Sequence, residues 1–393
     1  MQDTAAANVQ SEAQFAALVD ATAADPARSE RLTDLLREDH PSYGQRGTTT
    51  IVRMRGWVLL AVARAGVSDA ALIFVLEELD TGTDPYLVAA AARALRSYPR
   101  PNPALAPFVT RALANIRYRD EPVSFEAYGE YAVSSTGTSP VRELLATLTW
   151  LGPHARGALP ELEALRAQGS GLSRKLRIEV ERTIHAIGSA GHVDEPATHA
   201  CCGPSSDGVG NMSSWAPGAR RGSAPIESIA LQDHHGETIT FGEFFTGQPS
   251  IAVFFYTRCD NPMKCSLTVT KLARVQKLLE AQGFANRIRT AAITYDPAFD
   301  LPERLCIYGR DRGVRMDANH RMLRATDDNN TLRTHFELGV NFIESLVNRH
   351  RIEVYVLDAQ GRVAVSFERI HWDEQQVVTR AIETLNETVC CSD

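Results

Sequence analysis

Six of the seven cysteines fall into three close pairs, the feature of this sequence that most directly suggests chemistry. The pairs are Cys201 with Cys202, Cys259 with Cys265, and Cys390 with Cys391. Structural disulfide frameworks belong to small secreted domains, whereas close pairs in a large chain more often bind metal or exchange electrons. The pattern therefore predicts a metal site or a redox site.

The pair Cys259 and Cys265 lies where a predicted buried strand gives way to a helix. Residues 251–256 are continuously apolar, as in a central strand, and apolar residues at helical spacing follow from Leu267. Ligands in open α/β sheets gather at the carboxyl ends of strands, and a helix N-terminus favours a thiolate at Cys265. We expect the two sulfurs to meet over the loop, either as a disulfide or as two ligands of one ion.

Length and composition limit the class of protein. The chain has 393 residues, enough for two or three domains at roughly 150 residues each. A formal net charge of -7 offers no broad cationic surface, which argues against nucleic acid or an anionic membrane as a partner. No stretch approaches the roughly 18 apolar residues of a membrane helix, and the N-terminus lacks the order of a secretion signal. As written, the chain is expected to be cytoplasmic with no membrane span.

Composition and periodicity divide the chain into five segments. They are an N-terminal tail at 1–28, a helical repeat domain at 29–188, a flexible linker at 189–224, an α/β domain at 225–387 and a cysteine-containing C-terminal tail at 388–393. The linker is rich in Gly, Ser and Pro and contains one of the adjacent cysteine pairs. The order of predicted strands and helices after residue 225 is that of a thioredoxin-type layer structure.

Two segments of the helical region look like copies of one unit. Asp84-Pro85 and Ser139-Pro140 each precede an apolar helical run, and each proline suits the first turn of a helix. The region resembles HEAT repeats, most closely over residues 138–152, which implies a stacked all-α solenoid. Such a surface would contact a protein or peptide client. Candidate anchors are Tyr118, Tyr128 and Tyr131, although core packing explains these tyrosines equally well.

Four stretches of the C-terminal half carry a second resemblance. They are residues 231–236, 254–259, 294–302 and 354–362, in the expected order. From about residue 225 to 385 the chain resembles the Sco/SenC family, thioredoxin-fold proteins associated with copper delivery to cytochrome oxidase. The fold class expected for the whole chain is therefore multidomain, with a HEAT-like solenoid followed by a Sco-type α/β domain.

The Sco resemblance implies copper, as Cu(I) or Cu(II), bound by Cys259, Cys265 and His350. Two thiolates and an imidazole suit Cu(I), and an added oxygen or nitrogen donor would permit Cu(II). His371 and His335 are less favoured, because one follows the predicted hairpin and the other falls in a predicted helix.

The loop between the two cysteines departs from the family. Its cysteines are usually separated by three residues, whereas five separate them here. Met263 lies in this wider loop, as an extra soft ligand or as a gap-filling side chain.

The other cysteines lie outside the proposed ligand set. Cys201, Cys202, Cys390 and Cys391 are possible accessory thiols that could form a four-thiolate site, act as relay arms for the central pair, or be inert. His192 and His199 could add a nitrogen ligand to such a site. Cys306 is expected to be a buried apolar residue of an amphipathic helix.

Three functions remain open at this stage. The first is a copper-binding metallochaperone using Cys259, Cys265 and His350. The second is a thiol-disulfide oxidoreductase that uses the same cysteines with the adjacent pairs as electron arms. The third is an interaction scaffold whose redox site is structural. The Sco/SenC family usually works outside the cytoplasm, so an extracytoplasmic location is the alternative to a cytoplasmic one.

Overall fold

The structure is a computed structural model that describes residues 11–25, 30–126, 137–167, 171–189, 226–327 and 329–390, with no side chains for 388–390. It divides into two compact units, Met1–Asn211 and Met212–Asp393. Several residues singled out from the sequence lie outside the described side chains: Tyr128, Tyr131, His192, His199, Cys201, Cys202, Cys390 and Cys391.

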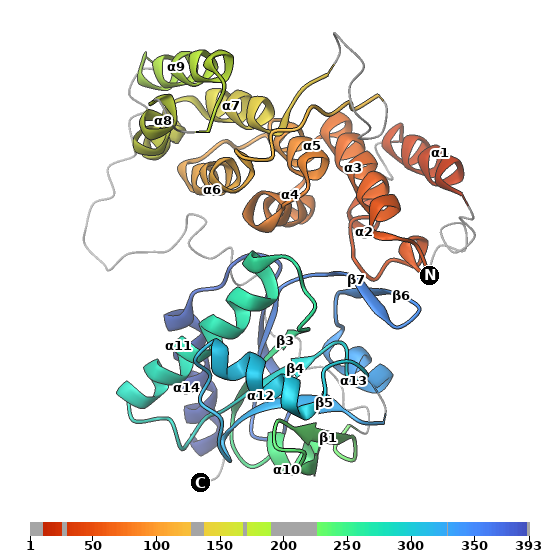
Figure 1. The fold of residues 1–393 in the computed structure, drawn as a ribbon, viewed down its shortest axis with the longest axis vertical. Coiled ribbons are helices and arrows are strands. Elements are labelled where there is room, and N and C mark those ends of the chain that lie inside the picture. The colour runs from red at the N-terminus through yellow and green to blue at the C-terminus, as the bar shows by residue number, and fades with distance from the viewer. Residues whose placement is uncertain are drawn as a thin grey trace. The chain divides into compact units, whose positions relative to one another are not determined.

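The N-terminal unit is built from helices (Figure 1). They are α1 (Glu12–Ala23), α2 (Arg31–Asp34), α3 (Thr48–Ala65), α4 (Asp69–Thr81), α5 (Pro85–Leu95), α6 (Ala106–Ile116), α7 (Pro140–Leu151), α8 (Leu159–Arg166) and α9 (Arg174–Ser189). The side chains of Asp84 and Ser139 accept hydrogen bonds from the first backbone N–H groups of α5 and α7. The helical character is therefore confirmed, while the HEAT-like solenoid stays a prediction.

Buried ion pairs tie the helices of this unit together. The guanidinium of Arg55 in α3 is fully buried and lies 3.3 Å from a carboxylate oxygen of Glu38 and 3.1 Å from one of Glu78 in α4. Glu143 in α7 is also buried, and its oxygens lie 2.9 Å from Arg93 and 2.6 Å from Arg96, at the end of α5. Each carboxylate therefore joins segments that are distant in sequence.

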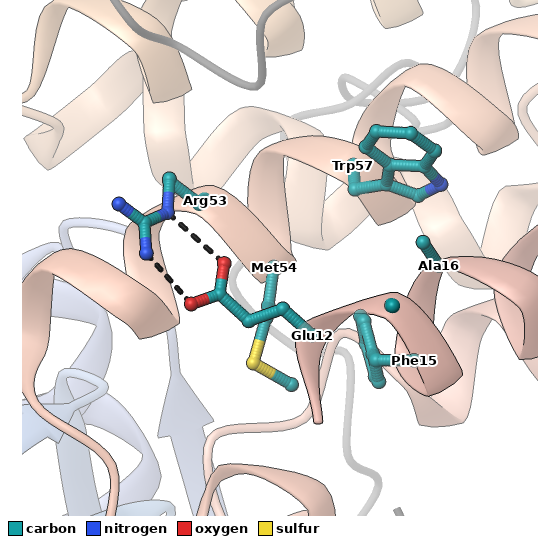
Figure 2. A pocket seen from close by; sticks show the side chains of 7 residues that line it. Glu12, Phe15, Ala16, Arg53, Met54 and Trp57 are labelled. Atoms are coloured by element: carbon teal, nitrogen blue, oxygen red, sulfur yellow. Dashed lines mark hydrogen bonds and ion pairs between the residues drawn. The ribbon is translucent and has the colours of Figure 1, made fainter.

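A pocket lies between α1 and α3. Figure 2 shows Phe15, Met54 and Trp57 in its lining and the ion pair between Glu12 and Arg53 at one side. The two charged groups are engaged with each other, and the remaining lining is largely apolar. This pocket offers no set of acid, base and nucleophile.

The C-terminal unit is a mixed sheet flanked by helices. The strands are β1 (Ala230–Asp233), β2 (Thr238–Thr240), β3 (Ser250–Phe255), β4 (Arg289–Thr294), β5 (His320–Ala325), β6 (Val340–Ile343), β7 (Leu346–His350), β8 (Glu353–Leu357) and β9 (Val363–Glu368). Seven of them form one sheet in the order β2-β1-β5-β4-β3-β8-β9, and β6 pairs with β7. The helices are α10 (Phe241–Phe245), α11 (Leu267–Ala281), α12 (Pro302–Asp311), α13 (Asn329–Phe336) and α14 (Glu374–Cys390).

Strand β3 is an interior strand of this sheet, between β4 and β8, and all six of its residues are buried. It runs parallel to β4 and antiparallel to β8, and α11 packs against both β3 and α14. The thioredoxin-like α/β fold expected from the sequence is confirmed. In the described part of the chain, no helix is both long and apolar enough to cross a membrane.

Several elements were not anticipated from the sequence. Strand β5, helix α10 and the β6–β7 hairpin lie in stretches for which the sequence predicted no element, whereas α13 corresponds to the predicted helix that contains His335. The hairpin is short and contains a register shift between Asn341 and Phe342, which breaks the alternation that identifies a strand. Helix α14 extends to Cys390, beyond residue 387, where the α/β domain was expected to end, because no helix-breaking residue intervenes.

Candidate metal centre

Three segments meet at one edge of the sheet because of how the strands run. Cys259 follows the carboxyl end of β3, and Cys265 lies in the turn Pro262–Ser266 that leads into α11. Strand β8 is antiparallel to β3, with Val354 opposite Val253, so β8 begins beside the end of β3. His350, three residues before β8, is thereby brought to the two cysteines.

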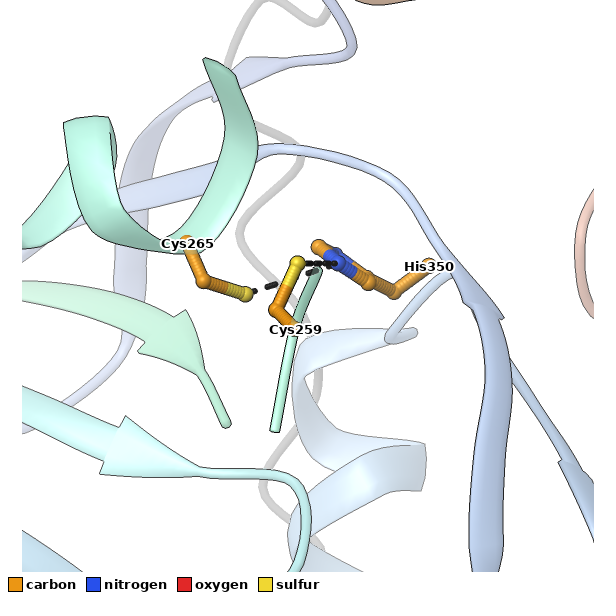
Figure 3. Close-up of side chains that lie close together, drawn as sticks. All are labelled: Cys259, Cys265 and His350. Carbon is orange, nitrogen blue, oxygen red and sulfur yellow. Dashed lines mark hydrogen bonds between the residues drawn. The ribbon is translucent and has the colours of Figure 1, made fainter. Parts of the chain in front are cut away.

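The side chains of Cys259, Cys265 and His350 converge (Figure 3). The Nε2 atom of His350 lies 3.4 Å from the Sγ of Cys259 and 3.4 Å from the Sγ of Cys265, and all three ligand atoms lie within 4.8 Å of one another. Cys265 and His350 are buried, whereas Cys259 is partly exposed. Within the described residues, no other group of three His, Cys, Asp or Glu side chains has such an arrangement.

The orientation of the His350 ring is fixed by the backbone. Its Nδ1 lies 2.9 Å from the carbonyl oxygen of Arg351. A carbonyl can only accept a hydrogen bond, so Nδ1 carries the proton and Nε2 presents its lone pair to the sulfurs. The rings of Tyr256 and Tyr295 flank the imidazole with centroids at 5.4 Å and 5.5 Å, and burial raises the pKa of both phenols. The imidazole is therefore oriented so that Nε2 can give its lone pair to a metal ion.

The two thiols differ in their ease of ionisation. A hydrogen bond from Cys265 holds the pKa of Cys259 well below its usual range, although burial opposes this. Burial, reinforced by the neighbouring Cys259, raises the pKa of Cys265 well above its usual range. The pair therefore shares one negative charge until a cation binds and displaces the second proton.

Residues after β4 brace the start of the cysteine loop. The backbone N–H of Thr257 donates to Asp300 at 3.1 Å, and the hydroxyl of Thr257 donates to the same carboxylate. Arg258 forms an ion pair with Asp296, and its guanidinium lies 4.1 Å from the centre of the Phe299 ring. These contacts fix the backbone immediately before Cys259.

The remainder of the loop forms a short π-helical turn, Pro262–Ser266. The Nζ of Lys264 donates to the carbonyl oxygen of His350 at 2.7 Å, and the Nε2 of His371 donates to the carbonyl oxygen of Met263 at 2.9 Å. The two neighbouring segments thus hold the wider loop on both sides. Short π-helical turns are frequent at functional sites.

The other candidate ligands lie elsewhere or in other roles. His371 supports the loop through its ring nitrogen, and His335 packs in α13 against Phe241 and Phe336. Met263 is half-buried, and its role as an extra ligand stays a prediction. Cys306 is half-buried in α12 rather than buried as expected, because its position lies between the buried and exposed faces of that helix.

A buried polar network beside His350 was missed from the sequence. Glu353 is fully buried and accepts hydrogen bonds from the Nε of Arg351 and the N–H of Gly339, both at 2.7 Å. It also accepts a hydrogen bond from the hydroxyl of Tyr295, whose ring flanks the imidazole. Two charged residues in an otherwise apolar strand region are the signal that could have revealed this network.

The donor set fits a soft, three-coordinate ion. Bond lengths of about 2.3 Å to sulfur and 2.0 Å to nitrogen, at a trigonal angle, would separate each sulfur from the nitrogen by about 3.7 Å. The observed separations of 3.4 Å require an expansion of only a few tenths of an ångström. A set of two thiolates and one imidazole favours a soft ion such as Cu(I) over harder ions.

The chain is similar to several solved structures, each of which it matches over less than half of its own length. A SCO1/SenC family lipoprotein from Bacillus anthracis str. Ames is 17% identical, with a TM-score of 0.36 and coverage of 42% of this chain and 96% of its own. Arabidopsis thaliana ScoI, solved with copper bound, is 17% identical, with a TM-score of 0.35 and coverage of 43% and 99%. Yeast Sco1 is 23% identical, with a TM-score of 0.34 and coverage of 43% and 96%.

A search of curated proteins found no match. The family model SCO1/SenC matches residues 219–387, which contain all three converging side chains. The C-terminal unit therefore carries a SCO1/SenC domain, which confirms the Sco/SenC resemblance predicted for this half of the chain.

Proposed function

We propose that the C-terminal unit binds one copper ion through Cys259, Cys265 and His350. The observation that carries this proposal is the position of the His350 Nε2, 3.4 Å from each sulfur, with its lone pair directed at them. Copper is the metal that the Sco resemblance implies, and the soft ligand set suits Cu(I) best. A nitrogen or oxygen ligand from solvent or a partner would extend the site to Cu(II).

We further propose that copper is a cargo passed to a client protein. Cys259 is the one partly exposed ligand, so an incoming thiolate can reach the ion from its side while Cys265 and His350 remain buried. Ligand exchange at Cys259 would then hand over the ion one bond at a time. A resident cofactor would need no such exposed ligand.

Copper affinity tests the ligand assignment. Cys201, Cys202, Cys390 and Cys391 are first replaced by Ser in the full-length chain, so that Cu(I) measured by chelator competition reports this site. We expect one Cu(I) per chain, and His350→Ala should weaken binding by more than the roughly 10–100-fold cost of losing an outer hydrogen-bond partner. Cys306→Ser is the matched control and should leave the affinity unchanged. An unchanged affinity in His350→Ala would overturn the assignment.

Transfer kinetics test the cargo role. The Cu(I)-loaded chain is mixed with a synthetic peptide that carries two cysteines, and the copper on each is followed over time. Exchange through Cys259 predicts a rate that rises with peptide concentration. A rate independent of the peptide would indicate slow spontaneous release and would argue for a resident ion.

The lowered pKa of Cys259 favours a second candidate function, thiol-disulfide exchange. The Cys259 thiolate would attack a partner disulfide and release one partner thiolate. Cys265, losing its proton, would then attack the Cys259 sulfur and release the second partner thiolate, so that the partner is reduced and the cysteine pair is oxidised. Cys265→Ser should trap the mixed disulfide, and His350→Ala should have little effect on the exchange. An untrapped partner would exclude this route.

Protein contact by the helical unit remains part of the proposal. Tyr118 is 68% exposed, so it is available as an anchor. We expect Tyr118→Ala to weaken capture of the client in a binding assay with the Cu(I)-loaded full chain, and no effect on Cu(I) affinity.

A further inference from the structure

Lys264 occupies an unusual position for a lysine. It lies directly before Cys265 in the π-helical turn Pro262–Ser266, and it is only 8% exposed. Lysine is rarely this buried, because removing an ammonium from water costs free energy unless polar groups replace the water. The carbonyl oxygen of His350, 2.7 Å from Nζ, is one such group.

This hydrogen bond joins two of the three proposed ligands. One end of it is the residue next to Cys265, and the other is the backbone of His350 itself. The same backbone segment orients the imidazole, because the Nδ1 of His350 donates to the next carbonyl along the chain. A shift of the His350 peptide would therefore move Nε2 relative to both sulfurs.

The loop has other supports that do not depend on Lys264. Its Met263 carbonyl accepts a hydrogen bond from His371, and the N–H of Met263 donates to the Asn261 side chain at 2.9 Å. We therefore expect the turn to persist when the ammonium is removed. The loop thus places a cation at the site in addition to connecting the cysteines.

The positive charge of Lys264 favours one oxidation state of bound copper over the other. Two thiolates, a neutral imidazole and Cu(I) sum to -1, whereas the same ligands with Cu(II) sum to zero. Adding the ammonium gives zero for Cu(I) and +1 for Cu(II). In a buried environment, where charges interact more strongly than in water, the neutral combination is favoured.

We propose that Lys264 is a positioning residue that ties the cysteine loop to the His350 backbone, and that its charge biases the bound ion towards Cu(I). The proposal deepens the copper function and rests on it. Loss of the charge should lower the Cu(II)/Cu(I) reduction potential, and loss of the hydrogen bond should displace the imidazole.

Two substitutions separate the charge from the hydrogen bond. Lys264→Gln removes the charge and keeps a donor, whereas Lys264→Met removes both. In the full chain with the four accessory cysteines replaced by Ser, we expect either variant to reduce the preference for Cu(I) about tenfold, a fall of about 59 mV for a one-electron couple. In the metal-free protein, Lys264→Met should also shift the ¹⁵N resonances of the His350 ring, while Lys264→Gln shifts them less.

Lys271→Gln is the matched control. The ammonium of Lys271 also donates to a backbone carbonyl, that of Trp372, and is largely buried beside Glu374. This variant should leave the potential and the His350 resonances unchanged, so an equal fall in potential would show a nonspecific effect and overturn the charge role.

Each outcome decides part of the proposal. An unchanged potential in both Lys264 variants overturns the charge role, and unchanged His350 resonances in Lys264→Met overturn the positioning role. If Lys264→Met does not fold, Lys264→Gln decides the charge role, and Lys264→Leu, which also lacks a donor, decides the positioning role through the His350 resonances. If the parent chain binds no copper, the proposed function and the bias to Cu(I) both fail, while the metal-free resonances still judge positioning separately.

Discussion

The two units use buried polar groups in opposite ways. In the helical unit, the buried Arg55 faces Glu38 and Glu78, and the buried Glu143 faces Arg93 and Arg96, so positive and negative groups meet. At the sheet edge of the C-terminal unit, two sulfurs and an imidazole nitrogen face one another, and all three can give electron pairs. In the first arrangement the charges balance one another, whereas the three donors of the second can be satisfied together by a cation.

Both arrangements occur side by side near His350. Arg351 pairs with Glu353 at 2.7 Å and with Glu368 at 2.8 Å, as the charged groups of the helical unit pair with each other. His350, which directly precedes Arg351, is a proposed metal ligand. Burial alone therefore does not mark a functional residue, and the chemical types of the groups that face each other are more informative.

The largest expected effect tests whether the pairs of the helical unit are structural. Arg55→Met leaves Glu38 and Glu78 buried without this cation, which should lower the free energy of unfolding by about 3–5 kcal/mol. Hydrogen exchange of α3 and α4 in the full chain measures the loss. Arg64→Met, in the same helix, removes an exposed pair with Asp20 and should cost about 1 kcal/mol or less. Equal losses in the two variants would contradict the comparison.

A smaller effect is expected beside the candidate metal centre. A Cβ at Gly339 would lie 2.5 Å from the Cδ of Arg351, so Gly339→Ala must displace that side chain from Glu353. We expect a loss of about 1–3 kcal/mol in the stability of the C-terminal unit. Copper affinity should fall by less than tenfold, because His350 is oriented by the Arg351 backbone carbonyl and not by its side chain.

Gly157→Ala serves as the control for this substitution, because a Cβ there meets nothing within 4 Å. Thermal unfolding and Cu(I) competition measure the two effects. If Gly339→Ala lowers the free energy of copper binding by more than it lowers the free energy of unfolding, the Arg351 pair belongs to the metal site.

The smallest expected effect depends on pH. Burial of Glu143 opposes ionisation, but hydrogen bonds and charges from Arg96 and other partners lower its pKa overall. A lowered pKa stabilises the folded state above the ordinary pKa of the carboxyl group, and this contribution is lost as pH falls through the folded-state value. Glu143→Gln should therefore cost about 1–2 kcal/mol at pH 7.

The same difference should shrink as the pH is lowered from 7 through the folded-state pKa of Glu143, below which both side chains are neutral. Hydrogen exchange of α5 and α7 across this range provides the measurement. A difference that stays constant with pH would mean that packing of Glu143, and not its charge, ties the helices.

The proposed metal ligands can be predicted from the sequence more fully than the residues that surround them. Cys259 and Cys265 follow an apolar run typical of a buried strand, and His350 precedes the predicted final hairpin, so topology alone brings them near one edge. The length of the loop between the cysteines is visible in the sequence, but the contacts of its side chains are not. Side-chain direction in a π-helical turn has no local periodicity, so nothing in the pattern aims Lys264 at the His350 carbonyl.

The partners of buried charges were equally hidden. Glu353 reads as an interruption of an apolar strand until Arg351, Gly339 and Tyr295 surround it in the fold. The Pro-initiated helices α5 and α7 were predictable because a capping residue and a proline are local signals. Contacts such as those of Glu143 span about fifty positions and leave no such local signal.

The distance along the chain between the proposed ligands has a consequence during synthesis. His350 is 91 residues beyond Cys259 and 85 beyond Cys265. A ribosome that has released only the cysteines has made a dithiol without its imidazole, and the β8 pairing that delivers the imidazole comes later still. Tight capture of a soft ion would then require that synthesis has passed both His350 and strand β8.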